Sequence, residues 1–174
     1  MKKEITLNSE VIYNGKVVKL RRDRVLCPNG NESYREIIDH HGGVATLALL
    51  DNKIILVKQY RYAYDEELYE LPAGKLEQGE SHLEAGKREL LEETGYAAKE
   101  TIYLGAMYPS CGYTNEIIHL YLAKDLYKLE RHLDEDEIID IYLFSLEEIK
   151  QMIKEGKIKD AKTICALYQY EYLI

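Results

Sequence analysis

The stretch at residues 74–96 constrains the fold most, because it joins a glycine-containing loop to a helix rich in carboxylates. Ser81 is followed three residues later by Glu84, which is the spacing of a capping box at a helix N-terminus. The helix is expected to cover about residues 82–94 and to end at Gly95, because glycine readily adopts the left-handed conformation of a helix C-cap.

The predicted helix concentrates acidic side chains on one side. At 100° per residue, Glu89, Glu92 and Glu93 fall within an arc of about 100°. Arg88 lies four residues from both Glu84 and Glu92 and is predicted to bridge them. Like charges at this spacing destabilise a helix by about 0.2–0.5 kcal/mol per pair, which solvent can absorb, so a solvated helix face is one interpretation. The other is a site for a hard divalent cation, which prefers oxygen ligands.

The complete order of this stretch resembles the Nudix box. That motif is a glycine, five residues, a glutamate, seven residues, then Arg-Glu-apolar-any-Glu-Glu-any-Gly-apolar. The matching residues are Gly74, Glu80, Arg88, Glu89, Leu90, Glu92, Glu93 and Gly95. Tyr96 departs mildly, since the family prefers an aliphatic residue there, and a half-buried tyrosine can satisfy the position. The resemblance implies a Nudix-type α/β/α sandwich with a mixed sheet.

Length, charge and cysteine use limit the classes of function. The 174 residues suit one domain with a small appendage. A net charge of −8 argues against a nucleic-acid partner, because nucleic-acid binding needs a basic surface. The 3 cysteines lie far apart and are typical of a reduced cytoplasmic protein. No signal peptide or apolar run of membrane length is visible, so we expect no membrane partner.

The first part of the chain, residues 1–42, is expected to form a small antiparallel β-sheet. Asn14-Gly15 is typical of a two-residue hairpin turn. The predicted strands are residues 10–13, 16–24 and 34–39, with a further turn at 28–31. A sheet of this size has little core of its own, so it is expected to pack against the rest of the chain or against another subunit.

The second part, residues 43–174, is the predicted Nudix domain. Nearly continuous apolar residues predict central strands of a mixed sheet at residues 44–50 and 54–57. Further strands are expected at residues 101–107, 116–123 and 138–144. Ser145 opens a helix that ends at Gly156, and Asp160 caps a last helix.

Features outside the box are similar to the ADP-ribose pyrophosphatase branch of the family. They are the N-terminal sheet, Arg35-Glu36, Gln59-Tyr60-Arg61, residues 70–74, the acidic loop at 133–137 and Asp160-Ala161-Lys162-Thr163. That branch implies a homodimer through the N-terminal sheet. It usually carries a proline where this chain has Cys111, in a Ser-Pro-Gly turn that helps to shape the adenine pocket, so the exact substrate stays open.

The resemblance also implies a set of site residues. Mg²⁺, or Mn²⁺ in its place, is expected on Glu89, Glu92, Glu93 and the carbonyl of Ala73. Arg88 joins these glutamates in the catalytic set, and Glu137 is the favoured general base among residues 134–137. Glu80 is expected to brace the loop or to reach the metal through water. The expected substrate-binding residues are Arg35, Arg61, Glu70, Ser110 and Gly112.

The implied activity is metal-dependent hydrolysis of the pyrophosphate bond of ADP-ribose, to AMP and ribose 5-phosphate, or of a related nucleoside diphosphate sugar. Two alternatives stay open at this point. One is a Nudix hydrolase that acts on another nucleotide, such as a UDP-sugar or a nucleoside triphosphate. The other is a sensor that binds ADP-ribose without cleaving it.

Overall fold

A computed structural model of the chain describes residues 2–133 and 138–173, and these residues form two compact units. The first unit comprises Met1–Gly42 and Tyr108–Ile117, and the second comprises Gly43–Met107 and Ile118–Ile174. The segment Tyr108–Ile117 belongs to the first unit because backbone hydrogen bonds join it to the third strand. Ile38 N–H donates to the Tyr113 carbonyl at 2.7 Å, and Asn115 N–H donates to the Ile38 carbonyl at 3.2 Å.

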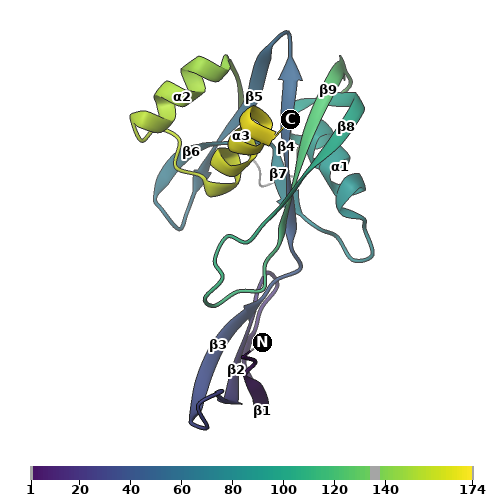
Figure 1. Cartoon of the computed structure of the whole chain (residues 1–174). Coiled ribbons are helices and arrows are strands. Elements are labelled where there is room, and N and C mark those ends of the chain that lie inside the picture. Colours follow the sequence, from purple (N-terminus) through teal and green to yellow (C-terminus); the bar gives the residue numbers. More distant parts are fainter. Residues whose placement is uncertain (1, 134–137, 174) are drawn as a thin grey trace. The chain divides into compact units, whose positions relative to one another are not determined.

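The first unit is built on an antiparallel sheet in the order β1-β2-β3 (Figure 1). Its strands are β1 (Ile5–Asn14), β2 (Lys19–Leu26) and β3 (Glu32–Asp39). The predicted two-residue turn at Asn14-Gly15 is wrong. Asn14 pairs with Lys19, and Gly15 N–H donates to the Val18 carbonyl at 3.0 Å, so residues 15–18 form the connection. A register shift near the end of β1 sets this pairing, and sequence patterns do not reveal such a bulge.

The second unit contains a mixed sheet, as predicted. Its strands are β4 (Gly43–Leu50), β5 (Lys53–Arg61), β6 (Glu66–Glu70), β7 (Ala73–Lys75), β8 (Tyr96–Met107), β9 (Ile118–Lys128) and β10 (Asp140–Phe144). The order is β10-β5-β4-β9-β8, with β6 beside β5 and β7 beside β4. Strands β4 and β9 run parallel, whereas the other pairs are antiparallel.

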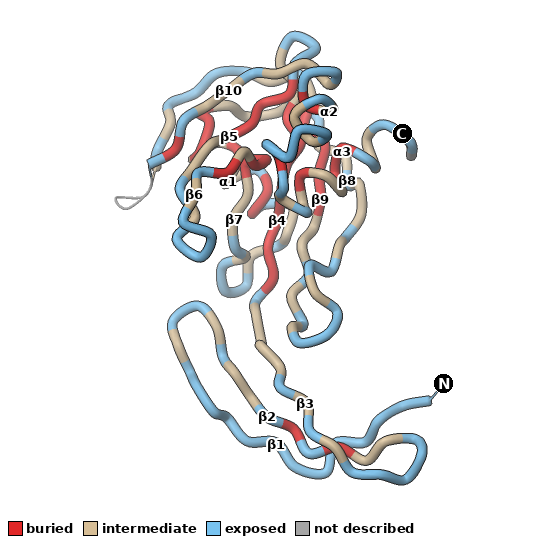
Figure 2. Tube along the Cα trace, turned by 90° about the vertical axis from the view of Figure 1, so that its left-hand side faces the viewer, coloured by how far each residue is buried: buried red, intermediate tan, exposed pale blue. Residues whose placement is uncertain are grey.

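Helices cover both faces of this sheet (Figure 1). They are α1 (His82–Thr94), α2 (Leu146–Lys154) and α3 (Ala161–Leu173). On β4, Ala45 and Leu47 pack in one cluster with Ile149 of α2, whereas Val44 packs with Ala85 of α1. Because alternate strand residues point to opposite faces, α1 and α2 lie on opposite sides of the sheet. The α/β/α sandwich is therefore confirmed, with its buried core along β4, β5 and β9 (Figure 2).

Helix α1 begins and ends where its sequence predicts. The Ser81 hydroxyl accepts from Glu84 N–H at 3.3 Å, and Gly95 has φ 73°, with its N–H bonded to the Leu91 carbonyl. The predicted bridge from Arg88 to Glu84 is wrong, because the Glu84 carboxylate binds Lys87.

The later helices also follow their local signals. Ser145 and Glu148 form a complete capping box at α2, and Asp160 accepts from Thr163 N–H at the start of α3. Across residues 2–133 and 138–173, none of the helices has the length and apolar character needed to cross a membrane.

Candidate active site

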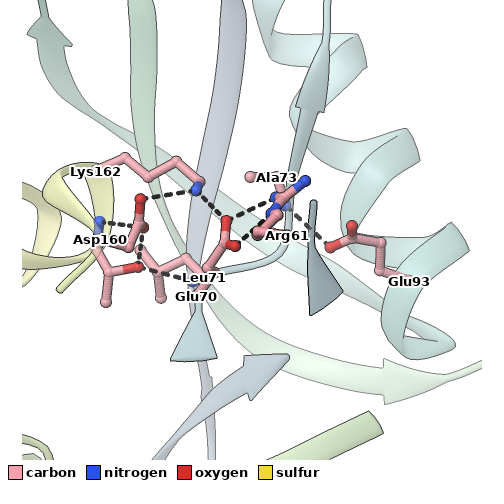
Figure 3. A network of polar contacts seen from close by, with 8 residues as sticks. Arg61, Glu70, Leu71, Ala73, Glu93, Asp160 and Lys162 are labelled. Carbon is pink, nitrogen blue, oxygen red and sulfur yellow. Dashed lines mark hydrogen bonds and ion pairs between the residues drawn. The ribbon is translucent and has the colours of Figure 1, made fainter. Parts of the chain in front are cut away.

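The backbone of Ala73 and Gly74, in the segment that precedes α1, lies against the acidic face of this helix. Ala73 N–H donates to Glu93 Oε2 at 3.0 Å (Figure 3). The Glu89 carboxylate lies against Gly74, where any side chain would collide with it. Glycine at position 74 therefore leaves room for the Glu89 carboxylate in this position, and both glutamates reach the backbone of residues 73–74.

Burial differs strongly along this face. The side chains of Glu89 and Glu92 are 12% and 37% exposed, whereas Glu93 as a residue is 2% exposed. The interpretation of a fully exposed acidic face is therefore wrong for Glu93. The Ala73 segment covers it, and the Ala73 N–H supplies a hydrogen bond that a buried carboxylate needs.

Arg88 gathers the other carboxylates of the box. Its guanidinium donates to Glu80 at 2.9 and 3.0 Å, to Glu89 at 2.8 Å and to Glu92 at 2.9 Å. It also donates to the Lys75 carbonyl at 3.2 Å. The bond to Glu80, together with the nearby charges of Glu89 and Glu92, raises the pKa of Arg88 although its partial burial opposes this. Arg88 therefore stays cationic and holds the acidic side chains in fixed positions.

Glu80 braces the loop before α1, which is one of the two roles predicted for it. Its Oε2 accepts from Glu77 N–H at 3.1 Å, while both of its oxygens bind Arg88. The bonds to Arg88 are the largest cause of the lowered pKa of Glu80.

The donors around residues 73–93 fit a hard divalent cation. In the described part of the chain, no three acidic, histidine or cysteine side chains already surround a common point. Glu89 and Glu92 bind Arg88, and Glu93 accepts from Ala73 N–H. The candidate donors are nonetheless all oxygens, and they come from one helix and the adjoining backbone, which is the donor chemistry that Mg²⁺ and Mn²⁺ prefer.

A charged network adjoins this face (Figure 3). Arg61 donates to both oxygens of Glu70, at 2.5 and 2.7 Å, and Lys162 binds the same carboxylate. Burial favours a raised pKa for Glu70, but Arg61 and Lys162 outweigh it and hold the pKa below its usual value. Glu70 is 2% exposed. The hydrogen bonds to Glu70 are the largest cause of the raised pKa of Arg61, and the nearby charge of Glu93 adds to it.

The other predicted site residues lie elsewhere in the chain. Arg35 is in β3 of the first unit, where it binds Glu4 and the Ser33 hydroxyl. Ser110 and Gly112 lie in the segment Tyr108–Ile117 of the same unit. Glu137, the favoured general base, falls outside the residues that the structure describes.

The start of α3 adjoins the site, although its residues were not among the predicted site residues. Asp160 accepts from both Lys162 and Thr163, while Lys162 binds Glu70 and Thr163 accepts from Leu71 N–H. Two signals in the sequence pointed to these residues: the helix cap at Asp160, and the similarity of Asp160-Ala161-Lys162-Thr163 to the ADP-ribose pyrophosphatase branch.

Comparisons with known proteins agree with this arrangement. The NUDIX domain family matches residues 39–167. A methanol dehydrogenase activator of Bacillus methanolicus is 47% identical over 167 residues, which cover 94% of this chain and 90% of that protein. An ADP-ribose pyrophosphatase of Bacillus subtilis (strain 168) is 44% identical with the same coverage. A GDP-mannose pyrophosphatase of Escherichia coli (strain K12) is 32% identical, covering 76% of this chain and 75% of that protein.

Among solved structures, one described as an ADP compounds hydrolase has a TM-score of 0.89 and covers 99% of this chain and 95% of its own. At 21% identity this likeness shows the fold. The family match covers most of the chain, and these relatives are more than 30% identical to it. Together with the geometry of the box, they show that the chain belongs to the Nudix family and is a Nudix hydrolase.

Proposed function

We propose that the protein hydrolyses the pyrophosphate bond of ADP-ribose, to AMP and ribose 5-phosphate, or of a related nucleoside diphosphate sugar. The observation that carries the proposal is the gathering of Glu89 and Glu93 at the backbone of Ala73 and Gly74. The relatives named ADP-ribose pyrophosphatase and GDP-mannose pyrophosphatase support a nucleoside diphosphate sugar as the substrate class.

Nudix hydrolases generally need a divalent metal ion, and Mg²⁺, with Mn²⁺ as its substitute, is the proposed one. Glu89, Glu92, Glu93 and the Ala73 carbonyl would hold it. When bound, such an ion supplies neutralisation of the diphosphate charge and increases the acidity of water.

The chain's own residues have distinct proposed tasks. Arg88 orients the carboxylates of Glu89 and Glu92 through the bonds described above. Arg61 has a side chain that is 39% exposed; its Nε and Nη2 bind Glu70, and its Nη1 is the proposed donor to a phosphate oxygen. Glu137 is the proposed general base. Arg35, Ser110, Gly112 and Glu70 are the remaining proposed substrate-binding residues.

The first unit is the proposed dimer contact. All ten residues of β1 are exposed, and they include the apolar side chains of Ile5, Leu7, Val11 and Ile12. An apolar strand of this kind gains stability when a partner covers it. The proposed partner is the same sheet of a second copy of the chain.

The test of the substrate is a comparison of kcat/KM with Mg²⁺ present. The panel contains ADP-ribose, ADP-glucose, UDP-glucose, GDP-mannose and a nucleoside triphosphate, with nucleoside monophosphates and inorganic pyrophosphate resolved among the products. ADP-ribose is expected to give the highest value and to yield AMP. A preference of more than about ten-fold, or 1.4 kcal/mol, for a substrate without adenine would refute the ADP-ribose assignment.

Cys111 is the residue to change within that comparison, because it replaces the proline that the ADP-ribose branch usually carries. Cys111→Pro restricts the backbone of an exposed loop before binding, which can stabilise one conformation by about 0.4–1 kcal/mol. The variant is expected to discriminate more strongly in favour of ADP-ribose. An unchanged ratio of kcat/KM values would contradict a role for this turn in selectivity.

A second candidate function is suggested by the relative named a methanol dehydrogenase activator, at 47% identity. In that case this chain would activate a dehydrogenase, in addition to hydrolysing a free nucleotide. The discriminating assay adds the protein, or its Glu93→Gln variant, to a methanol dehydrogenase. Stimulation by both forms would indicate activation without hydrolysis, whereas stimulation by the wild type alone would tie activation to the Nudix site.

A further inference from the structure

The segment at residues 70–73, which leads into the Nudix box, passes from one strand pairing to another. Its pairing with β5 ends at Glu70, and its pairing with β4 begins at Ala73. Leu71, between them, is fully buried, so its backbone N–H needs a partner inside the protein. That partner is the hydroxyl of Thr163 at the start of α3, at 2.9 Å.

Thr163 is oriented by the cap of its own helix. Its hydroxyl donates to Asp160 Oδ2 at 2.6 Å, and its backbone N–H donates to the same oxygen at 3.0 Å. A hydroxyl has one proton to donate, so its bond to Asp160 leaves the oxygen lone pairs for Leu71 N–H. Thr163 is fully buried, which excludes competition from solvent.

A second contact runs beside the first (Figure 3). Lys162 donates to Asp160 Oδ1 at 3.0 Å and also binds the Glu70 carboxylate. Adjacent residues of the segment are therefore bound by adjacent residues of α3. The negative charges of Glu70 and Asp160 compensate the positive charges of Arg61 and Lys162, as charges removed from water require.

The other end of the segment reaches the box helix. Pro72 separates Leu71 from Ala73, and its carbonyl accepts from Thr46 N–H at 2.9 Å. Ala73 N–H then donates to Glu93. The proline ring fixes φ at residue 72, and the bond from Thr46 N–H restrains the Pro72 carbonyl, so few backbone rotations between Leu71 and Ala73 can absorb a displacement of Leu71.

We propose that Thr163 and Lys162 are positioning residues that hold the Ala73 backbone in register with Glu93 for metal binding. The inference rests on the proposed function, in which the Ala73 carbonyl and Glu93 belong to the metal site. Mg²⁺ requires near-octahedral oxygen ligands at about 2.0–2.1 Å, so a loosely held segment binds it less well even when each ligand is present.

The test uses the full chain with Thr163→Val, which keeps the shape of the side chain and removes the hydroxyl. Thr163→Ser retains the hydroxyl and serves as the rescue. The matched control is Thr114→Val in the first unit, where the hydroxyl also bridges two backbone groups, donating to the Ile38 carbonyl and accepting from Glu116 N–H, both at 3.1 Å. The measurement is Mn²⁺ binding without substrate, followed by electron paramagnetic resonance, together with the Mg²⁺ concentration that gives half-maximal hydrolysis.

Thr163→Val is expected to weaken Mn²⁺ binding by about ten-fold, since residues that orient metal ligands typically contribute 10–100-fold to affinity. Thr163→Ser should bind close to the wild-type level, and Thr114→Val should be unchanged. Wild-type Mn²⁺ affinity in Thr163→Val, or an equal loss in Thr114→Val, would overturn the inference.

Lys162→Met provides an independent route if Thr163→Val does not fold, because it leaves the Leu71–Thr163 bond in place. It is expected to weaken Mn²⁺ binding in the same direction, and unchanged affinity in a folded Lys162→Met protein would also overturn the inference. The wild type distinguishes failure of the proposed function from failure of the inference. A wild-type protein that binds no Mn²⁺ and cleaves no diphosphate refutes the proposed function and the inference with it, whereas normal wild-type behaviour beside unchanged variants refutes the inference alone.

Discussion

At the scale of single residues, Glu93 combines burial with charge. The Ala73 N–H bonds one of its oxygens, and the residue is 2% exposed. Glu93→Gln keeps a carbonyl oxygen that can accept the same hydrogen bond but removes the negative charge. We expect hydrolysis to fall by about 10²–10³-fold, the usual effect of removing one electrostatic group from an active site. Steady-state kinetics with saturating Mg²⁺ measures this, while circular dichroism checks that the protein is folded.

The matched control is Glu84→Gln, the same chemical change on the same helix. Glu84 has a side chain that is 62% exposed, and it binds Lys87 outside the candidate metal site. Its replacement is expected to leave hydrolysis near the wild-type rate. Wild-type turnover by Glu93→Gln would remove Glu93 from the site.

Arg88 supports the box through its geometry as well as its charge. Its contacts to Glu80, Glu89, Glu92 and the Lys75 carbonyl use the planar fork of the guanidinium. Lysine has the same charge but cannot span these acceptors. Arg88→Lys is expected to reduce the free energy of unfolding by about 1–3 kcal/mol, the range for losing hydrogen bonds to charged groups. Urea denaturation measures this, and an unchanged midpoint would show that charge alone suffices.

At the scale of elements, the beginning of α1 rests on an aromatic cluster from β8 and β9. The His82 ring stacks on His119, with centroids 3.9 Å apart and planes at 8°. Tyr103 OH lies 3.0 Å from His119 Nδ1, and the Tyr121 hydroxyl contacts His82 Nδ1. Burial, and then the neighbouring His82, lower the pKa of His119. This environment therefore favours the neutral form of His119.

This cluster predicts a pH dependence of stability. A lowered pKa means that the folded state binds a proton less readily than the unfolded state, whose histidine titrates near about 6.5. The stabilising contribution is present above that pH and is lost as the pH falls through the lower folded pKa. The difference in the free energy of unfolding between pH 7.5 and pH 5.5 is expected to be smaller in His119→Asn than in the wild type.

The control for that measurement is His41→Asn, because His41 is exposed. This variant should keep the wild-type pH dependence. An identical pH dependence in His119→Asn and the wild type would exclude the stacked pair as its source.

At the scale of the whole molecule, the exposed apolar side chains of β1 would be unusual in a protein that stays a monomer. Single exposed apolar residues are ordinary, but β1 carries several of them along one strand. The full chain is expected to sediment as a dimer at micromolar concentration. Val11→Lys combined with Ile12→Lys places charge on both faces of β1 and should shift the protein toward the monomer.

Tyr168→Lys is the control for the sedimentation measurement. Tyr168 of α3 is 60% exposed, so the substitution adds charge at a surface aromatic residue outside β1. It should leave sedimentation unchanged. An active wild-type monomer at micromolar concentration would contradict the dimer.

Much of the second unit was predictable because its signals are local. The caps at Ser81 and Gly95 act within four residues of themselves, so α1 could be bounded from sequence alone. The apolar runs of β4 and β5 predicted central strands, and their parallel and antiparallel pairing confirmed a mixed sheet. The spacing of the Nudix box likewise identified the family before any contact was known.

Tertiary structure decided what depends on residues far apart in the chain. The burial of Glu93 follows from a hydrogen bond to Ala73, and the support of Leu71 comes from Thr163, 92 positions away. The connection at residues 15–18 follows from a shifted strand register that no local pattern records. Helix caps and apolar periodicity are short-range properties of a sequence, whereas the partners of a buried polar group are set by which segments the packed core brings together.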